Sequence, residues 1–187
     1  MNIGFAMCGS FCTFSQVFPV MERLALSHRV VPIFSTVSCT TDSRFGTAEE
    51  FIVRAEKICG MQPLRTIAQV EPIGPKKLLD ALIVAPCTGN TLAKLAHGIA
   101  DGPVTMAVKS HLRNGRPVLI AVSTNDALAV AAENIGKLMA RKNIYFVPFG
   151  QDDADSKPTS MVADFSYIPN SLEAAMNGSQ LQPMILG

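Results

Sequence analysis

The chain has no long hydrophobic run and no excess of charge of either sign. No segment approaches the ~20 uninterrupted apolar residues that a membrane helix needs. Residues 1–7 contain no basic stretch and lead directly into a strand-like sequence, so we expect no signal peptide. The formal net charge is only +1, which argues against an extended nucleic-acid surface or a membrane anchor. We therefore expect a cytoplasmic protein that binds neither nucleic acid nor membrane.

Cysteine and histidine are too dispersed to indicate a metal site or a disulfide framework. The number of cysteines, five, is odd, and no two are spaced as Cys-x-x-Cys. The three histidines are isolated from one another along the chain. We therefore expect no bound metal, and cysteines that serve as small buried hydrophobic residues in a reducing compartment.

What the chain does contain is an alternation of short apolar runs and amphipathic stretches. Its 187 residues, 48% of them hydrophobic, suit one domain with one core. Apolar runs predict strands at residues 3–7, 29–34, 80–85, 117–122 and 144–147. Helical patterns cover residues 11–26, 48–60, 90–97, 103–114, 127–141 and, more weakly, 171–177.

Local signals define several helix ends. Thr47 and Glu50 have the spacing of a capping box, and Gly60 is placed to end the helix that they open. Pro103 suits the first turn of its helix. Residues 63–74 could form a short helix or a loop.

Continuous apolar strands separated by helices predict a parallel sheet covered on both faces. We predict a single doubly wound, Rossmann-like (flavodoxin-like) α/β domain over residues 1–187. In such a sheet, ligands bind beyond the carboxyl ends of the strands, where the strand order reverses. The residues that follow each strand are therefore the candidates for a site.

Small and hydroxyl-bearing residues follow the first two strands. Gly9 and Ser10 follow the first, and Ser35, Thr36 and Ser38 follow the second. Glycine lets the backbone approach an anion, and a helix start supplies N–H donors. Because no Gly-x-Gly-x-x-Gly motif is present, a phosphate cradle and ordinary turn chemistry both remain possible.

The strongest feature follows the third strand. Residues 85–101 read Ala-Pro-Cys-Thr-Gly-Asn-Thr-Leu-Ala-Lys-Leu-Ala-His-Gly-Ile-Ala-Asp. Thr88, Asn90 and Thr91 place three polar side chains at one helix start, whereas a cap needs only one. Gly89 allows a ligand to approach closely. These groups would suit the ribityl chain or pyrimidine ring of a flavin, and Asn90 could instead be only a helix cap.

This run resembles the Pro-Ala-Ser-Ala-Asn-Thr motif, and the Ala-Lys-x-Ala-x-Gly-Ile-Ala-Asp helix after it, of the flavoprotein family. That family includes cysteine-type decarboxylases and flavin prenyltransferases. Here Thr88 stands for the serine of the motif, while Cys87 and Gly89 stand for its two alanines. The resemblance implies bound FMN. It implies cofactor-binding residues at Gly9, Ser10 and Ser35 for the phosphate, and at Thr88, Asn90, Thr91 and Ser123.

The resemblance also extends to the fourth strand end, with a departure. Ser123-Thr124-Asn125 falls where the family has Pro-x-Met-Asn, which implies that Asn125 lies beside flavin and substrate. A turn in which Asn125 or Asp126 caps the next helix is the alternative. Family decarboxylases carry a histidine upstream of the third strand, whereas residues 69–75 contain none. Decarboxylation of a cysteine-derived acid is therefore not expected.

The remaining matching segments resemble one branch of the family, at residues 43–46, 71–76, 123–128, 148–153 and 157–164. That branch takes part in making pyridine-2,6-dicarboxylate during endospore formation, beside a Rossmann-type A subunit. The resemblance implies oxidation of a dihydropyridine dicarboxylate with a flavin as the acceptor. It also implies a homo-oligomer, either a trimer or a multiple of trimers.

A dicarboxylate substrate needs cationic or amide partners. We take Arg44 and Lys157 as the candidate cations, although each could be a solvated surface charge, and Asn125 as the orienting amide. Glu71 is a candidate base. Two other functions remain open: a non-catalytic binding partner of the A subunit, and an FMN-dependent decarboxylase-like or prenyltransferase-like enzyme.

Overall fold

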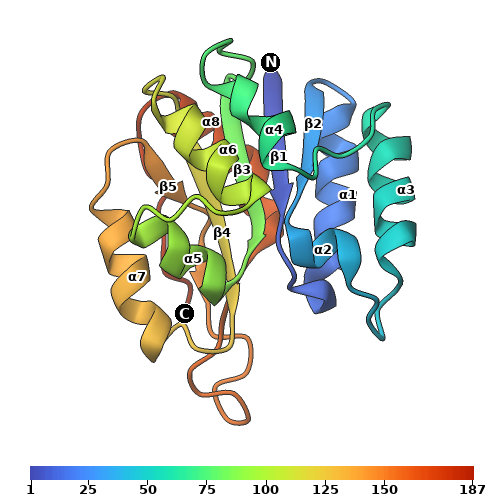
Figure 1. Cartoon of the computed structure of the whole chain (residues 1–187). Helices are drawn as coiled ribbons and strands as arrows, with labels where there is room; N and C mark the ends of the chain where they lie inside the picture. The colour runs from blue at the N-terminus through green and yellow to red at the C-terminus, as the bar shows by residue number, and fades with distance from the viewer.

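The computed structural model describes all 187 residues and contains one seven-stranded sheet between layers of helices (Figure 1). The strands are β1 (Asn2–Met7), β2 (Arg29–Phe34), β3 (Ala81–Cys87), β4 (Val118–Thr124), β5 (Ile144–Phe146), β6 (Phe149–Gly150) and β7 (Met161–Ala163). The α-helices are α1 (Phe14–Ala25), α2 (Thr36–Thr40), α3 (Ala48–Cys59), α4 (Ile67–Val70), α5 (Gly89–Ala96), α6 (Pro103–Leu112), α7 (Val130–Met139) and α8 (Ile168–Met176). Three 3-10 helices complete the elements: η1 (Phe11–Thr13), η2 (Glu71–Ile73) and η3 (Phe165–Tyr167).

The central strands confirm the predicted doubly wound topology. They run in the order β2-β1-β3-β4, with β5 beside β4, and all of these neighbours are parallel. All seven residues of β3 are buried, as expected for a parallel strand covered on both faces. The order reverses between β1 and β3, so the flavodoxin-like fold places its ligand crevice at the carboxyl ends of these two strands.

The sheet is nevertheless mixed, and the prediction of a wholly parallel sheet needs this correction. β7 pairs antiparallel with the end of β4, through Ser123 with Val162 and Thr124 with Met161, and β6 pairs antiparallel with β7. These strands have only two or three residues, too few to give a periodic signal in the sequence. They can pair there because β5 occupies only Val118 to Ile120 of β4. The loop between β6 and β7 therefore lies beside the carboxyl end of β4.

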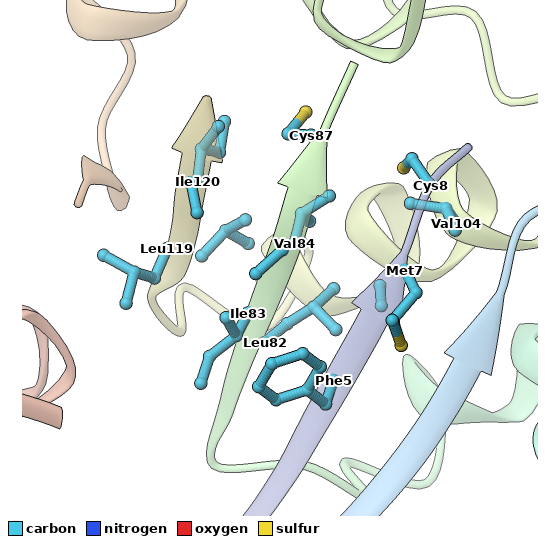
Figure 2. Packing of buried hydrophobic residues seen from close by; sticks show 14 of the residues in the cluster. Phe5, Met7, Cys8, Leu82, Ile83, Val84, Cys87, Val104, Leu119 and Ile120 are labelled. Atoms are coloured by element: carbon cyan, nitrogen blue, oxygen red, sulfur yellow. The ribbon is translucent and has the colours of Figure 1, made fainter. Parts of the chain in front are cut away.

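One hydrophobic cluster of 48 buried residues fills the space between sheet and helices. In Figure 1, α4, α5 and α6 lie in front of the sheet and α8 lies behind it. Figure 2 shows side chains of β1, β3 and β4 that belong to this cluster, among them Phe5 and Ile83. Both are completely buried, and the burial of each contributes about 1.5–3 kcal/mol.

The helix ends follow the local signals, with one exception. The Thr47 N–H donates to Glu50 Oε2 at 2.7 Å and the Glu50 N–H to Thr47 Oγ1 at 3.2 Å, which confirms the capping box. Gly60 ends α3 with a φ of 68°, a left-handed conformation that favours glycine. The helix predicted over residues 127–141 is shorter, because the carbonyl of Asp126 accepts the Ala129 and Ala131 N–H groups in a preceding turn.

The segment 63–74, which the sequence left open, contains both short helix and loop. Leu64 forms a bridge with Ile33 of β2, and α4 and η2 follow. No helix of the chain combines the length and the apolar character that a membrane span requires.

Candidate functional site

Two adjoining cavities lie at the carboxyl end of the sheet. The β4-side cavity, about 610 Å³, lies between the ends of β1, β3 and β4 and the β6–β7 loop. The β2-side cavity, about 320 Å³, lies between the ends of β1, β2 and β3 and the start of α6. Gly9, Thr88 and Asn90 line both cavities. The two cavities therefore meet at the switch point between β1 and β3.

Leaving aside the candidate base Glu71, the structure brings together nine of the ten residues predicted to bind the cofactor or the substrate. Besides the three shared residues, Ser10, Ser123, Asn125 and Lys157 line the β4-side cavity, and Ser35 and Thr91 line the β2-side cavity. The exception is Arg44, an exposed residue in the turn closed by Ser43 and Gly46. Its guanidinium lies 4.9 Å from the ring centroid of Phe45. Within one chain, Arg44 does not reach either cavity.

The first strand ends in a tight approach to α2. A Cβ on Gly9 would lie 2.7 Å from Val37 Cγ1, so a larger residue would have to displace the Val37 side chain. Ser10 Oγ lies 2.8 Å from Ser123 Oγ, which links the ends of β1 and β4. The loop after β1 is thus fixed between two other strand ends.

The second strand ends in a serine cap. Ser35 Oγ accepts the Ser38 N–H at 3.1 Å, and the Ser38 hydroxyl donates to the carbonyl of Met7 at 2.9 Å. The first N–H groups of α2, on Thr36 and Val37, have no partner inside the helix, and both residues line the β2-side cavity. This end of the site supplies hydrogen-bond donors for an anion.

The third strand end shows which residue is the cap. Thr88 Oγ1 accepts the Thr91 N–H at 3.4 Å, so Thr88 is the N-cap of α5. Asn90 lies inside the helix, and its exposed side chain makes no hydrogen bond within the chain. The interpretation of Asn90 as the cap is therefore wrong. Its amide is free to bind a ligand in either cavity.

Two departures from the family motif pack against each other. A Cβ on Gly89 would lie 2.7 Å from Thr124 Oγ1 and 2.8 Å from Asp126 Oδ1. Gly89 stands where the motif has its second alanine, and Thr124 stands where the family has methionine at the end of the fourth strand. The smaller residue at position 89 therefore leaves room for the Thr124 hydroxyl. The Thr124 hydroxyl donates to Asp126 Oδ1, so Asp126 does not cap α7 as one interpretation had it.

Each cavity contains one ion pair. In the β2-side cavity, Lys94 Nζ lies 2.9 Å from Asp101 Oδ2, and no other cation lines this cavity. In the β4-side cavity, Lys157 Nζ lies 3.0 Å from Asp152 Oδ2, and the hydrogen bond with Asp152 raises the pKa of Lys157. An anion in the β2-side cavity would therefore be held mainly by N–H and hydroxyl donors, and one in the β4-side cavity by Lys157.

The cysteines only partly follow the expectation of buried hydrophobic residues. Cys8 and Cys87 are buried at the ends of β1 and β3 (Figure 2), and burial raises the pKa of the Cys87 thiol well above its usual range. Cys12, in contrast, is exposed and lines the β4-side cavity. For Cys12 the expectation is wrong, because the 3-10 helix η1 turns this residue towards the cavity.

Sequence reasoning missed Cys12, Asp152 and Ser160, which also line the β4-side cavity. Asp152 and Ser160 belong to the β6–β7 loop, whose position relative to the strand ends could not be inferred from its polar sequence. Glu71, the candidate base, is exposed on η2, which packs against α6, and it lines neither cavity. The sequence did contain one indication that Asp152 could pair with Lys157, because it lies five residues before Lys157 in the same polar stretch.

The donor set fits a phosphorylated ligand with a polar chain. The N–H groups and hydroxyls of the β2-side cavity suit a phosphate, and Gly9 lines this cavity without a side chain of its own. Thr91 also lines the β2-side cavity, and Asn90 lines both this cavity and the larger β4-side cavity. A flavin mononucleotide has a phosphate, a polar ribityl chain and a ring system in this order, which matches the order of these groups along the two cavities.

Comparison with known proteins agrees with this geometry. The flavoprotein family model matches residues 1–177. The B subunit of dipicolinate synthase from Bacillus subtilis (strain 168) is 43% identical over 186 residues, which cover 99% of this chain and 93% of that protein. The crystal structure of the dipicolinate synthase B subunit from Bacillus halodurans superposes with a TM-score of 0.91 at 44% identity, covering 100% of this chain and 96% of the other.

A more distant structure shares the fold. DmrB of Burkholderia xenovorans, solved in complex with FMN, has a TM-score of 0.72 at 15% identity and covers 94% of this chain and 95% of its own. The chain therefore belongs to the flavoprotein family and, within it, to the B subunits of dipicolinate synthase.

Proposed function

We propose that this protein is the FMN-binding subunit of a dipicolinate synthase and takes part in oxidising dihydrodipicolinate to dipicolinate together with an A subunit. The observation that carries the proposal is the continuity of the two cavities over Gly9, Thr88 and Asn90. The β2-side cavity offers hydrogen-bond donors for a phosphate, and the β4-side cavity that adjoins it contains the cation Lys157 and the amide of Asn125. The name of the Bacillus subtilis relative supports the substrate and the partner.

The β2-side cavity would hold the phosphate, through the backbone at Gly9 and the first turn of α2 that Ser35 caps. Asn90 and Thr91 would contact the polar chain and ring edge. We propose FMN rather than a dinucleotide because the chain forms one phosphate-sized donor cluster, and because DmrB was solved with FMN. A bound flavin supplies an acceptor for an electron pair.

The residues of the β4-side cavity would act on the substrate. Lys157 offers a charge-assisted hydrogen bond to a carboxylate, and the Asn125 amide can orient the ring or the flavin. Thr159 Oγ1 donates to the carbonyl of Asn125 at 2.7 Å, which ties the β6–β7 loop to this residue. The chain thus holds its substrate between β4 and that loop.

An absorbance spectrum of the purified protein, alone and with its A subunit, tests the proposal. We expect a yellow protein from which mass spectrometry identifies released FMN. Anaerobic addition of the dihydropyridine dicarboxylate should bleach the flavin. A stoichiometric FAD or NAD would overturn the cofactor assignment. A flavin that is never bleached, with or without the A subunit, would favour a non-catalytic role in binding.

We further propose that the whole chain forms one domain and assembles as a homo-oligomer, a trimer or a multiple of trimers. A single buried cluster runs from Ile3 to Leu172, which supports one domain. Large apolar side chains are exposed at Ile99, Leu128 and Val130, and could pack between copies. Arg44, outside the cavities of its own chain, would be available to a neighbouring copy. A monomer in light scattering at micromolar concentration would contradict the assembly.

A further inference from the structure

The β4-side cavity contains four ionisable side chains: Cys12, Asp126, Asp152 and Lys157. Oxidation of a dihydropyridine releases a proton as well as an electron pair, so one group must accept that proton. Asp126 accepts the Thr124 hydroxyl and forms no ion pair that a substrate carboxylate could displace. Lys157 carries its own proton. Asp152 is the remaining carboxylate, and its side chain is 27% exposed.

Asp152 is joined to Lys157, but the loop that carries both does not depend on this pair. The Lys157 N–H donates to the carbonyl of Asp153 at 2.8 Å, and Gln151 Nε2 donates to the carbonyl of Pro158 at 2.9 Å. The Leu128 N–H donates to the carbonyl of Thr159 at 3.0 Å, which anchors the loop to the turn after β4. The two side chains can therefore separate while the loop keeps its place.

We propose that a substrate carboxylate displaces Asp152 from Lys157, and that the released Asp152 carboxylate accepts the proton that the ring loses. This inference rests on the proposed function. The electron pair of one ring C–H bond would leave as hydride to a bound oxidised flavin, and the proton of a neighbouring N–H or C–H bond would move to Asp152. The new ring double bond completes the pyridine.

The exchange explains how one carboxylate can be a weak base before substrate binds and a stronger base afterwards. Burial favours a higher pKa for Asp152, but the hydrogen bonds from Ser160 and Lys157 outweigh it and hold the pKa of that carboxyl below its usual range. Substrate removes the Lys157 contact and brings negative charge, and both changes raise the pKa of Asp152.

The other ionisable groups near Asp152 cannot take the place of Lys157 as its partner. Cys12 on η1 and Asp126 in the turn after β4 line the same cavity as the pair. Asp153 turns away to accept hydrogen bonds from Ser156, and these bonds lower the pKa of its carboxyl. None of these groups offers a second cation to replace Lys157.

Calorimetric titration of the flavin-loaded protein with pyridine-2,6-dicarboxylate tests the inference without turnover. At about pH 5.5, in buffers that differ in ionisation enthalpy, wild-type binding should take up protons, because the carboxylate of Asp152 binds them more readily once it leaves Lys157. Asp152→Asn should bind the dicarboxylate equally well or a few-fold more tightly, without this uptake, since no carboxylate competes for Lys157. Lys157→Met should weaken binding about tenfold or more.

The matched control is Glu133→Gln, which breaks the 2.6 Å pair between Glu133 and Lys137 on α7, outside both cavities. It should leave affinity and proton uptake unchanged. Asp152→Glu should restore the uptake that Asp152→Asn loses, and bound flavin reports that each variant is folded. Wild-type binding without uptake, or equal uptake by Asp152→Asn, would overturn the inference and leave the proposed function standing. Failure of the wild type to bind the dicarboxylate, with or without the A subunit, would overturn both.

Discussion

The hydroxyl oxygens of Ser10 and Ser123 lie 2.8 Å apart and join the ends of β1 and β4 across the strand between them, β3. Ser123 is buried, and Ser10 is half-buried at the floor of the β4-side cavity. The pair sets the distance between two loops that line the site. A hydrogen bond of this kind contributes about 0.5–1.5 kcal/mol to stability.

A double-mutant cycle measures that link. We expect Ser10→Ala and Ser123→Ala each to lower the free energy of unfolding by about 0.5–1.5 kcal/mol, and the double variant to cost clearly less than their sum. Denaturant unfolding of the flavin-free proteins gives all four values. Ser179→Ala, on an exposed serine that donates to the carbonyl of Ala174, is the control and should be additive with Ser10→Ala. Additive costs for the two site serines would show that the hydroxyls do not interact.

The Asn90 side chain, which has no partner within the chain, should contribute to flavin binding and little to folding. We expect Asn90→Leu to lose flavin, because a ligand hydrogen bond of roughly 1–3 kcal/mol disappears and an apolar group takes its place. The melting temperature of the flavin-free protein should hardly change. Flavin-to-protein ratio and melting temperature are measured on the same preparation.

The control for Asn90 is a true helix cap that lies outside both cavities. Thr47→Ala removes the capping box of α3 and should cost about 0.5–2 kcal/mol of stability while the protein keeps its flavin. A yellow Asn90→Leu protein would refute the assigned role of Asn90.

The strand-end rule explains why most of the site could be predicted. Parallel strands bring their carboxyl ends to one edge, so residues that follow β1, β2, β3 and β4 meet there whatever their distance in sequence. The choice between Thr88 and Asn90 as the cap was not predictable, since both residue types cap helices. The extended backbone of Thr88, with φ −78° and ψ 159°, decides it.

The positions of Asp152 and Arg44 relative to the site depend on tertiary contacts and could not be predicted from the sequence. Asp152 reaches the cavity because two residues of β7 pair with the end of β4, a contact that no local pattern predicts. Arg44 lies in a polar stretch after β2, where a substrate-binding cation is expected, but the turn closed by Ser43 and Gly46 directs it onto Phe45. Polarity after a strand therefore predicts a site only where the chain stays at the sheet edge.

Two glycine-to-alanine changes should have opposite effects. At Gly89 the new Cβ would meet Thr124 Oγ1 and Asp126 Oδ1 at 2.7 and 2.8 Å, so their hydrogen bond must break or move. We expect Gly89→Ala to lower the free energy of unfolding by about 1–3 kcal/mol. Gly136, inside α7, has nothing within 4 Å of an added Cβ, so Gly136→Ala should gain about 0.5–1 kcal/mol. Thermal unfolding compares them, and equal effects would contradict the crowding at Gly89.

His111 gives the fold a pH dependence that is independent of the site. Its side chain is buried on α6, where Nε2 donates to the carbonyl of Pro117 at 3.1 Å and Nδ1 has no partner. Burial lowers the pKa of His111 from 6.5 to about 4, because a proton on Nδ1 would be a buried charge without an acceptor.

The unfolded chain therefore binds this proton more readily than the folded chain. The stabilisation is complete above the unfolded pKa of about 6.5 and is lost as the pH falls towards the folded pKa. Between about pH 7 and pH 5 the wild type should lose about 2 kcal/mol of unfolding free energy through His111. In His111→Gln the side-chain amide can still donate to the Pro117 carbonyl. This variant should not show the loss of unfolding free energy between about pH 7 and pH 5 that is due to His111, although it is less stable at neutral pH. Denaturant unfolding across this pH range measures both proteins, and parallel curves would assign the acid sensitivity to other groups.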